Sequence, residues 1–493
     1  MSTSPHIDLI DTTLRDGNQS LWGATGLTSA MILEIAPVID RIGFRSVDFT
    51  TSTHMAVAVR WHRENPWERI RLARAAMPDT PLSFLTTGMR FISWEVAHEE
   101  VMRLAYRLLV ENGIRRFYVM DPMNDMPATI AAAQLIAAEG VTDITGALVY
   151  TVSPVHDDAF YAARAGELAA APCIKSVYLK DPGGLLTPER TRTIIPAIRA
   201  QLRGKPLELH SHCTIGLAQF SYLEAAPLGV SALHTSAGPL GNGAAQPAAE
   251  SILANLRELG LATQIDPEAL AKMSAYFRAL AQAEGLPLGQ PLDYDARYFR
   301  HQMPGGMLGT LRRQLKEMRQ EARLAEVLEE VERVRAELGY PIMVTPFSQV
   351  VGTQAFMNVT SGKRYANVPD EVIRYALGLF GKPSVPLAPE IEERILGLPR
   401  AQELATQPGM PGLAELRRRF GAGSADEELI LRAVMPAEQV DAMRAAGPCQ
   451  RGYNPSTRPV MKLVEELAKR RDVKQIKIEK PGFKLELRSR VAH

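Results

Sequence analysis

Cysteine is scarce in this sequence. Three cysteines occur in 493 residues, namely Cys173, Cys213 and Cys449, and they are far apart. Without a CxxC pair, neither a structural zinc knot nor a disulfide framework is expected. This usage fits a protein of a reducing compartment.

An excess of charge and long apolar runs are also missing. The chain has 56 basic and 55 acidic residues, so it carries no surplus of positive charge that would hold a phosphate backbone, and we expect no nucleic-acid partner. The N-terminal segment MSTSPHIDLIDTTLRD lacks the features of a signal peptide. No run approaches the roughly 20 apolar residues of a membrane-spanning helix. We therefore expect a cytoplasmic protein.

What the sequence does contain is a repeated β/α pattern over residues 1–290. Short apolar runs alternate with amphipathic stretches such as 29–42, 96–112 and 188–202, which is typical of βα units around a parallel sheet. Eight units in roughly 250 residues predict a (β/α)8 TIM barrel. The eight predicted strands are Ile7–Asp11, Ser46–Phe49, Leu82–Leu85, Arg116–Met120, Thr145–Tyr150, Ser176–Leu179, Leu207–His210 and Ala232–Thr235.

A mostly helical domain is expected to follow, over residues 291–455. Its charged run Leu311–Leu338 repeats opposite charges at helical spacing and predicts a solvated helix face. The segment Gln402–Gly412 contains two Pro-Gly pairs and is interpreted as a linker, followed by two further helical stretches.

The tail, residues 456–493, is predicted to form a helix and a hairpin. The helix is expected over Pro459–Arg471 and the hairpin strands over Val473–Ile478 and Phe483–Leu487. A segment this small cannot bury a core of its own, so we expect it to pack on a partner chain.

Polar residues follow several predicted strands, where a TIM barrel places its catalytic groups. Strand one leads into a loop with Arg15, Asp16 and Gln19, strand six ends at Lys180, and strand seven ends at His210 and His212. Strand four is followed by Asp121, Asn124 and Asp125.

The His-x-His spacing indicates a metal site. Side chains alternate along a strand, so His210 and His212 lie on one side and can bind one ion, with Asp16 as a third ligand from another strand end. Paired histidines also occur on ordinary surfaces, and the triplet alone is weak. A cationic Lys180 would be repelled by that ion. It is therefore either a surface residue or an amine that CO2 has converted to a carbamate.

Five strings resemble one family over nearly the whole chain. They are DTTLRDGNQS, LKDPGGLLTPE, HSHCTIG, HQMPGGMLGTL and VTPFSQVVGTQAFMNV. They are similar to the carboxyltransferases that include the B subunit of pyruvate carboxylase, the oxaloacetate decarboxylase alpha subunit and the transcarboxylase large subunit. RENPWERIRLARAAMP and NVPDEVIRYALGLFGKPSVPLAPEIEERIL belong to the same pattern, in the same order.

The resemblance implies a site and a reaction. Asp16, His210, His212 and a carbamylated Lys180 would bind a divalent ion, usually zinc or manganese, with magnesium or cobalt as alternatives. Arg15 and Gln19 would orient a small carbon-acid acceptor. Thr345 would carry the proton between biotin and the acceptor carbon, although from sequence alone it could equally cap a helix before Pro346.

The match breaks at the strand ends. Where the family has arginines, this chain has Thr87 after strand three and Tyr118 in strand four, and His234 replaces an aspartate in strand eight. The strand-four arginine binds the pyruvate carboxylate in the oxo-acid enzymes, and a tyrosine cannot reproduce that bidentate contact. We therefore expect preserved chemistry on a pyruvate/oxaloacetate-class or different acceptor, with Arg90 or His54 as compensating groups.

Biotin is expected on a separate protein. The nearest match to the carrier motif AMKM is residues 460–463, within an amphipathic helical pattern without flanking strands. The resemblance thus implies a biotin carboxyl carrier protein and a biotin carboxylase subunit as partners, around a homo-oligomer, a dimer. The tail hairpin is a candidate docking element for the carrier.

Two other functions stay open from sequence. One is a metal-dependent lyase or aldol-type enzyme similar to hydroxymethylglutaryl-CoA lyase, which shares the DTTLRDG start and the His-x-His triplet but needs neither Lys180 nor Thr345. The other is a non-enzymatic assembly scaffold, against which the retained ligand set argues.

Overall fold

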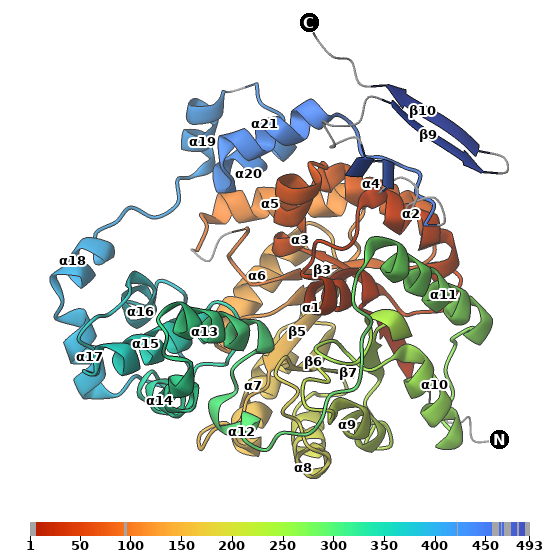
Figure 1. Cartoon of the computed structure of the whole chain (residues 1–493). Helices are drawn as coiled ribbons and strands as arrows, with labels where there is room; N and C mark the ends of the chain where they lie inside the picture. The colour runs from red at the N-terminus through yellow and green to blue at the C-terminus, as the bar shows by residue number, and fades with distance from the viewer. Residues whose placement is uncertain are drawn as a thin grey trace, which may run out of the picture.

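Eight parallel strands close into a barrel in the computed structural model, which describes residues 6–92, 96–421, 423–455, 463–464, 466–467, 475–480 and 483–488 (Figure 1). Each strand pairs with the next, and β8 pairs with β1 to close the cylinder. All eight predicted strands are confirmed, with shifts of one or two residues at their ends. Their bounds are β1 Asp8–Asp11, β2 Val47–Thr51, β3 Leu82–Thr86, β4 Arg116–Val119, β5 Asp143–Val149, β6 Ser176–Asp181, β7 Leu207–Ser211 and β8 Ala232–Thr235.

Helices surround the strands. The three amphipathic stretches named above become α2, α5 and α8, and Pro at the first turn or a Thr, Asp or Asn cap starts many of the helices. The barrel helices are α1 Asn18–Trp22, α2 Ser29–Ile39, α3 Ser52–Val57, α4 Pro66–Ala76, α5 Glu99–Asn112, α6 Met126–Ala138, α7 Asp158–Ala170, α8 Pro188–Arg199, α9 Ala218–Ala225, α10 Ala249–Glu258 and α11 Pro267–Glu284.

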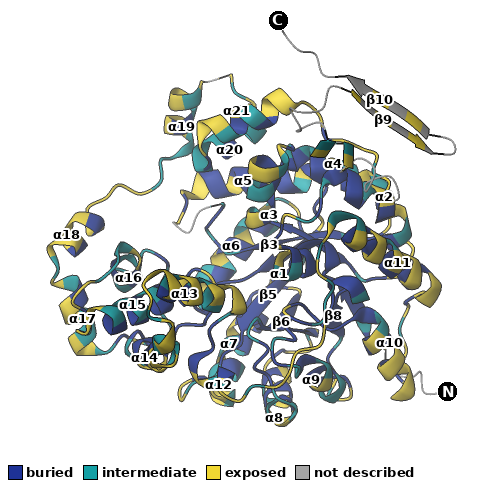
Figure 2. Cartoon of the chain, in the orientation of Figure 1, coloured by how far each residue is buried: buried dark blue, intermediate teal, exposed yellow. Residues whose placement is uncertain are grey.

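Strand side chains alternate between two cores, as a period of two requires. Phe84 and Phe117 face outward and pack with the barrel helices. Their chain neighbours Leu85 and Tyr118 face inward and join Tyr178 in a separate cluster inside the cylinder, to which Ile342 of the helical domain also belongs. The barrel strands are dark blue in Figure 2, since nearly every residue in them is buried.

A helical domain with its own core lies beside the barrel, in teal and light blue in Figure 1. Its helices are α12 Tyr298–His301, α13 Gly305–Glu317, α14 Leu324–Glu337, α15 Phe347–Ser361, α16 Asp370–Ala376, α17 Pro389–Leu396 and α18 Pro399–Ala405. The charged run predicted as a solvated face is two helices, α13 and α14, separated by a short 3-10 turn. Only one side is solvated, because Leu311, Val327 and Val334 on the other side are buried in the domain core.

Three more helices return to the barrel, where two helical stretches were predicted. They are α19 Leu413–Phe420, α20 Asp426–Val434 and α21 Ala437–Ala446. Leu416, Leu429 and Val440 are buried in the barrel core rather than in that of the helical domain. The predicted linker is confirmed only in its second half, because α18 extends to Ala405.

The predicted hairpin is confirmed as β9 Gln475–Lys480 and β10 Phe483–Arg488, paired antiparallel. The predicted helix Pro459–Arg471 lies mostly outside the described residues, as does the segment 460–463 that resembles a biotin-attachment motif. No helix of the described chain is both long and apolar enough to cross a membrane.

Candidate metal centre

The site begins in the loop that follows β1. A π-helical turn, Thr13–Gly17, carries Arg15 and Asp16 into the open end of the barrel, and both side chains are buried. Arg15 donates through Nε to Asp48 Oδ2 at 2.8 Å, and its Nη2 lies 3.1 Å from Asp16 Oδ2. Arg15 therefore holds two carboxylates in place, one of them facing the histidines of β7.

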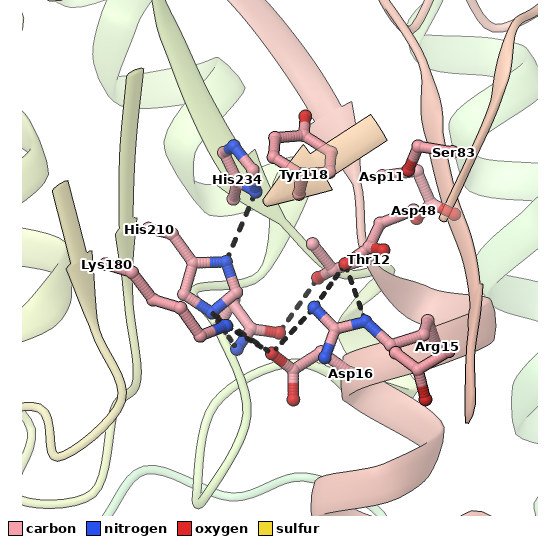
Figure 3. A network of polar contacts seen from close by, with 12 residues as sticks. Asp11, Thr12, Arg15, Asp16, Asp48, Ser83, Tyr118, Lys180, His210 and His234 are labelled. Atoms are coloured by element: carbon pink, nitrogen blue, oxygen red, sulfur yellow. Dashed lines mark hydrogen bonds and ion pairs between the residues drawn. The ribbon is translucent and has the colours of Figure 1, made fainter. Parts of the chain in front are cut away.

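Asp16, His210 and His212 form one buried cluster. Figure 3 shows Asp16, Lys180 and His210 of this region close together. Asp16 Oδ2 lies 3.1 Å from His210 Nε2 and 3.4 Å from His212 Nε2, and the two Nε2 atoms are 3.2 Å apart. The prediction that the His-x-His triplet presents both imidazoles on one side is confirmed. The three ligand atoms lie within 4.8 Å of one another, a spacing that one ion can bridge.

The hydrogen bonds around the histidines leave their Nε2 atoms as acceptors. His212 Nδ1 is 2.6 Å from the carbonyl oxygen of Ala244, so Nδ1 carries the proton. Thr12 Oγ1 donates to Gln246 Oε1 at 2.9 Å, which turns the amide of Gln246 toward the histidines. Gln246 Nε2 then donates to His210 at 3.2 Å and to His212 at 3.1 Å. Such second contacts orient imidazoles for metal binding.

The charges of the cluster also suit a divalent cation. Burial alone would raise the pKa of Asp16, but Arg15, His212 and Lys180 outweigh it and hold that pKa well below its usual range. Burial, followed by the charge of Lys180, lowers the pKa of His210 well below its usual value, so its ring is neutral. Asp16 Oδ2 is buried and faces both imidazoles, with the guanidinium of Arg15 on its other side. One carboxylate oxygen and two imidazole nitrogens fit zinc or manganese.

Lys180 lies at the same cluster rather than on the surface. Its Nζ is 3.3 Å from His210 Nε2 and 3.6 Å from Asp16 Oδ2, and the side chain is only 6% exposed. Burial lowers its pKa to about 8, against an opposing contribution from Asp16. The surface alternative for Lys180 is therefore wrong, and its amine is neutral in a sizeable fraction of molecules at mildly alkaline pH.

Three further predicted site residues, Arg90, His54 and Thr87, are not members of the metal cluster. Arg90 is buried and joins Asp121 at 3.4 Å, the carbonyl of Thr87 at 3.1 Å and the carbonyl of Phe380 in the helical domain. His54 is buried, and burial followed by the charge of Arg15 lowers its pKa to about 3, so its ring is neutral. Thr87 is half-buried.

Tyr118 lies deep in the cylinder. It is 1% exposed, and its hydroxyl donates to Glu208 Oε2 at 3.3 Å. Gln19 is exposed at the start of α1. Asp121 accepts the backbone N–H of Met123 at 2.8 Å and shapes the turn after β4, so the acidic residues of this strand end do not join the metal cluster.

Thr345 is exposed and directly follows a segment that covers the barrel. Ile342 belongs to the cluster inside the cylinder, and Val344 packs against it. The alternative role of Thr345 as a helix cap is wrong, since the N-cap of α15 is Pro346 and no side-chain cap bond forms there.

Sequence reasoning missed Asp48, Gln246 and Glu208. Asp48 is the second residue of β2 and pairs with Arg15 from the loop after β1, and Gln246 lies in the loop after β8. Glu208 precedes His210 by two residues on β7, so the same alternation that singled out the histidine pair places it inside the barrel, and that signal was available.

Comparisons with known proteins give consistent matches. A family model described as a conserved carboxylase domain matches residues 299–478, and one described as HMGL-like matches residues 124–276. The B subunit of pyruvate carboxylase from Methanothermobacter thermautotrophicus is 35% identical over 440 residues, covering 87% of this chain and 76% of that protein. The 2-oxoglutarate carboxylase large subunit of Hydrogenobacter thermophilus is 31% identical over 445 residues, covering 88% and 67%.

The fold is similar to a solved structure. The carboxyl transferase domain of Rhizobium etli pyruvate carboxylase, with pyruvate and biocytin, superposes with a TM-score of 0.79 at 25% identity. The match covers 92% of this chain and 80% of that one.

Proposed function

The chain belongs to the carboxyltransferase family that includes the B subunit of pyruvate carboxylase, and from this premise we propose that it moves CO2 between carboxybiotin on a separate carrier protein and a small enolisable acceptor. The observation that carries the proposal is the convergence of Asp16, His210, His212 and Lys180 at the barrel mouth. The lyase alternative fails, because a conserved carboxylase domain matches residues 299–478 and the relatives that match most of the chain are carboxylase subunits.

Asp16, His210 and His212 would hold a divalent ion. When bound, this ion supplies Lewis-acid stabilisation of negative charge on the acceptor's oxygen. Arg15 keeps the carboxylate of Asp16 oriented toward the histidines, and Gln246 and Ala244 keep the lone pairs of the two imidazoles directed at the same point. Zinc and manganese are the ions that this donor set favours.

Lys180 would complete the ligand set as a carbamate. Its neutral amine would attack the carbon of CO2: a carbon–nitrogen bond forms, one C=O π bond breaks with its electron pair going to oxygen, and the nitrogen loses a proton to solvent. A neutral group thus becomes an anionic oxygen donor. A pKa of about 8 supports this step, because an ordinary lysine amine is almost wholly protonated near neutral pH. The change also removes the repulsion between an ammonium group and the cation.

Thr345 would transfer the proton between the ureido nitrogen of biotin and the acceptor carbon. A hydroxyl can donate and accept at once, and Thr345 is exposed at the end of the segment that covers the barrel interior. Arg15 would contribute charge to acceptor binding, although its guanidinium is already shared between Asp48 and Asp16.

The acceptor is proposed to differ from pyruvate. Where the oxo-acid enzymes have a carboxylate-binding arginine, Tyr118 is buried with its hydroxyl on Glu208, and the nearby Arg116 is paired with the same carboxylate. Neither side chain is available as a charged clamp. The names of the relatives, among them a 2-oxoglutarate carboxylase, indicate that this family uses more than one acceptor.

A carboxyl-exchange assay tests the function. The full chain, loaded with zinc or manganese, is incubated with free biotin or biotinylated carrier and a panel of labelled acids that begins with pyruvate and oxaloacetate. We expect biotin-dependent exchange on at least one panel member and little on pyruvate. Exchange that is independent of biotin, or full activity on pyruvate, would contradict the respective part of the proposal.

A further inference from the structure

A series of buried, hydrogen-bonded side chains runs from the metal cluster into the barrel. His210 Nδ1 lies 3.2 Å from His234 Nδ1, and His234 Nε2 lies 3.2 Å from Glu208 Oε2. Glu208 also forms an ion pair with Arg116 and accepts the hydroxyl of Tyr118. All five side chains are almost completely buried. Figure 3 shows His234 above His210, on the side away from Asp16.

With the amide of Gln246 oriented as in the structure, the donors and acceptors of this series agree with one direction. At the end nearest the metal cluster, the amide of Gln246 donates to His210 Nε2, so this nitrogen is an acceptor and the proton of His210 is on Nδ1. His210 therefore donates to His234 Nδ1. At the other end, the carboxylate of Glu208 can only accept, so His234 carries its proton on Nε2. The contacts at both ends therefore agree with the same pair of tautomers.

The charge of Glu208 is kept in place by its partner. That partner is Arg116, which forms a buried ion pair with the Glu208 carboxylate at the end of this series. Tyr178 stacks on the ring of His234 with centroids 5.6 Å apart and an interplanar angle of 8°, which restricts the orientation of that ring.

We propose that His234 is a positioning residue. It accepts a hydrogen bond from Nδ1–H of His210 and so fixes the tautomer and ring angle of this metal ligand, while Glu208 and Arg116 hold His234 in place. The inference rests on the metal site of the proposed function. It also explains why a histidine can stand where the family usually has an aspartate, because the acidic group here is on β7, at Glu208, with His234 as the link between it and His210.

Two substitutions and a control test the role. His234→Phe keeps an aromatic ring against Tyr178 but cannot accept from His210, whereas His234→Asn restores an acceptor for His210 and a donor for Glu208. Tyr178→Phe is the matched control, since the Tyr178 hydroxyl has no hydrogen-bond partner among the described residues. Zn2+ and Co2+ affinities of the metal-depleted full chain are measured by chelator competition, together with the visible absorption spectrum of the Co2+ form.

We expect His234→Phe to weaken metal binding by about 10- to 100-fold and to change the Co2+ spectrum, as the loss of an outer contact to a ligating histidine does elsewhere. His234→Asn should return both toward wild type, and Tyr178→Phe should leave both unchanged. A folded His234→Phe protein with wild-type affinity and spectrum would overturn the inference. Failure of the wild type itself to bind metal would instead overturn the metal site of the proposed function.

Nitrogen NMR of histidine-labelled wild type provides a test that needs no destabilising variant. In the metal-depleted chain, His210 should be the Nδ1–H tautomer and His234 the Nε2–H tautomer. The opposite tautomer at His210 would refute the proposal even if His234→Phe did not fold.

Discussion

At the scale of single residues, Lys180 decides the charge of the proposed site. As metal ligands, Asp16 contributes one negative charge and the two imidazoles contribute none. A carbamate on Lys180 would bring the ligand set to two negative charges, which balance the charge of a divalent ion.

Carbamylation of Lys180 should depend on pH in a definite direction. Burial lowers the pKa of the amine to about 8, so the neutral, CO2-reactive form is scarce at pH 6.5, amounts to about half at pH 8 and prevails above. With 13C-labelled CO2 and the metal-depleted chain, the carbamate signal in 13C NMR should therefore rise from pH 6.5 to 8.5. Lys180→Met is the control and should lack the signal, and a wild-type signal that falls with pH would contradict this assignment.

Thr345 should matter for proton transfer and not for metal binding. Thr345→Ala is expected to lower biotin-dependent exchange by roughly 100-fold or more, the range of a lost general acid–base group, with unchanged metal content. Thr345→Ser keeps the hydroxyl and should retain most of the activity. Equal losses in both variants would count against a proton-carrying hydroxyl.

Sequence predicted the residues whose positions follow from local geometry. His210 and His212 face one way because strand side chains alternate, and Asp16 follows another strand end. Asp48 and Gln246 were not predicted, since their contacts join residues 33 and 36 positions away and depend on strand register and loop closure.

At the scale of elements, the barrel strands were predictable because buried parallel strands form short apolar runs bounded by turns. The surface against which α19–α21 pack was not predictable. An amphipathic helix shows that one face is buried but not which surface covers it, and these helices return to α5 and the barrel core.

Leu429 on α20 should therefore contribute to the stability of the barrel. Its side chain is fully buried in the barrel core, so Leu429→Ala is expected to lower the free energy of unfolding by about 2–5 kcal/mol. Leu259→Ala, at a position that is 51% exposed, should change it by less than about 0.5 kcal/mol. Urea denaturation of both variants measures the difference, and equal midpoints would show that α20 unfolds independently of the barrel.

The tail hairpin is the proposed docking element for the carrier. Lys477, Lys484 and Glu479 form ion pairs on its exposed positions, and two strands without further support are marginal in water, which favours a partner. Truncation after Pro459 should weaken co-purification of the biotin carrier while the metal content stays at the wild-type value. Unchanged capture of the carrier would exclude this role.

At the scale of the whole molecule, polar contacts join the helical domain to the mouth of the barrel. Arg335 of α14 donates to Thr151 Oγ1 at 2.9 Å, and Thr151 in turn donates to Gln302 Oε1 at 2.8 Å. Together with Arg90, which reaches the carbonyl of Phe380, these contacts hold Thr345 and its neighbours over the open end. The sequence predicted both parts but not how they meet, because each contact joins residues far apart in the chain and depends on loop conformation.

Metal analysis of the purified full chain tests the central claim most directly. The wild type, dialysed free of loosely bound ions, should retain about one divalent ion per chain, as a closed carboxylate–imidazole set does. The variant Asp16→Asn/His212→Ala should retain almost none while unfolding with the same cooperativity. A wild type that exchanges carboxyl groups without a bound ion, or a double variant that retains the ion, would contradict the account.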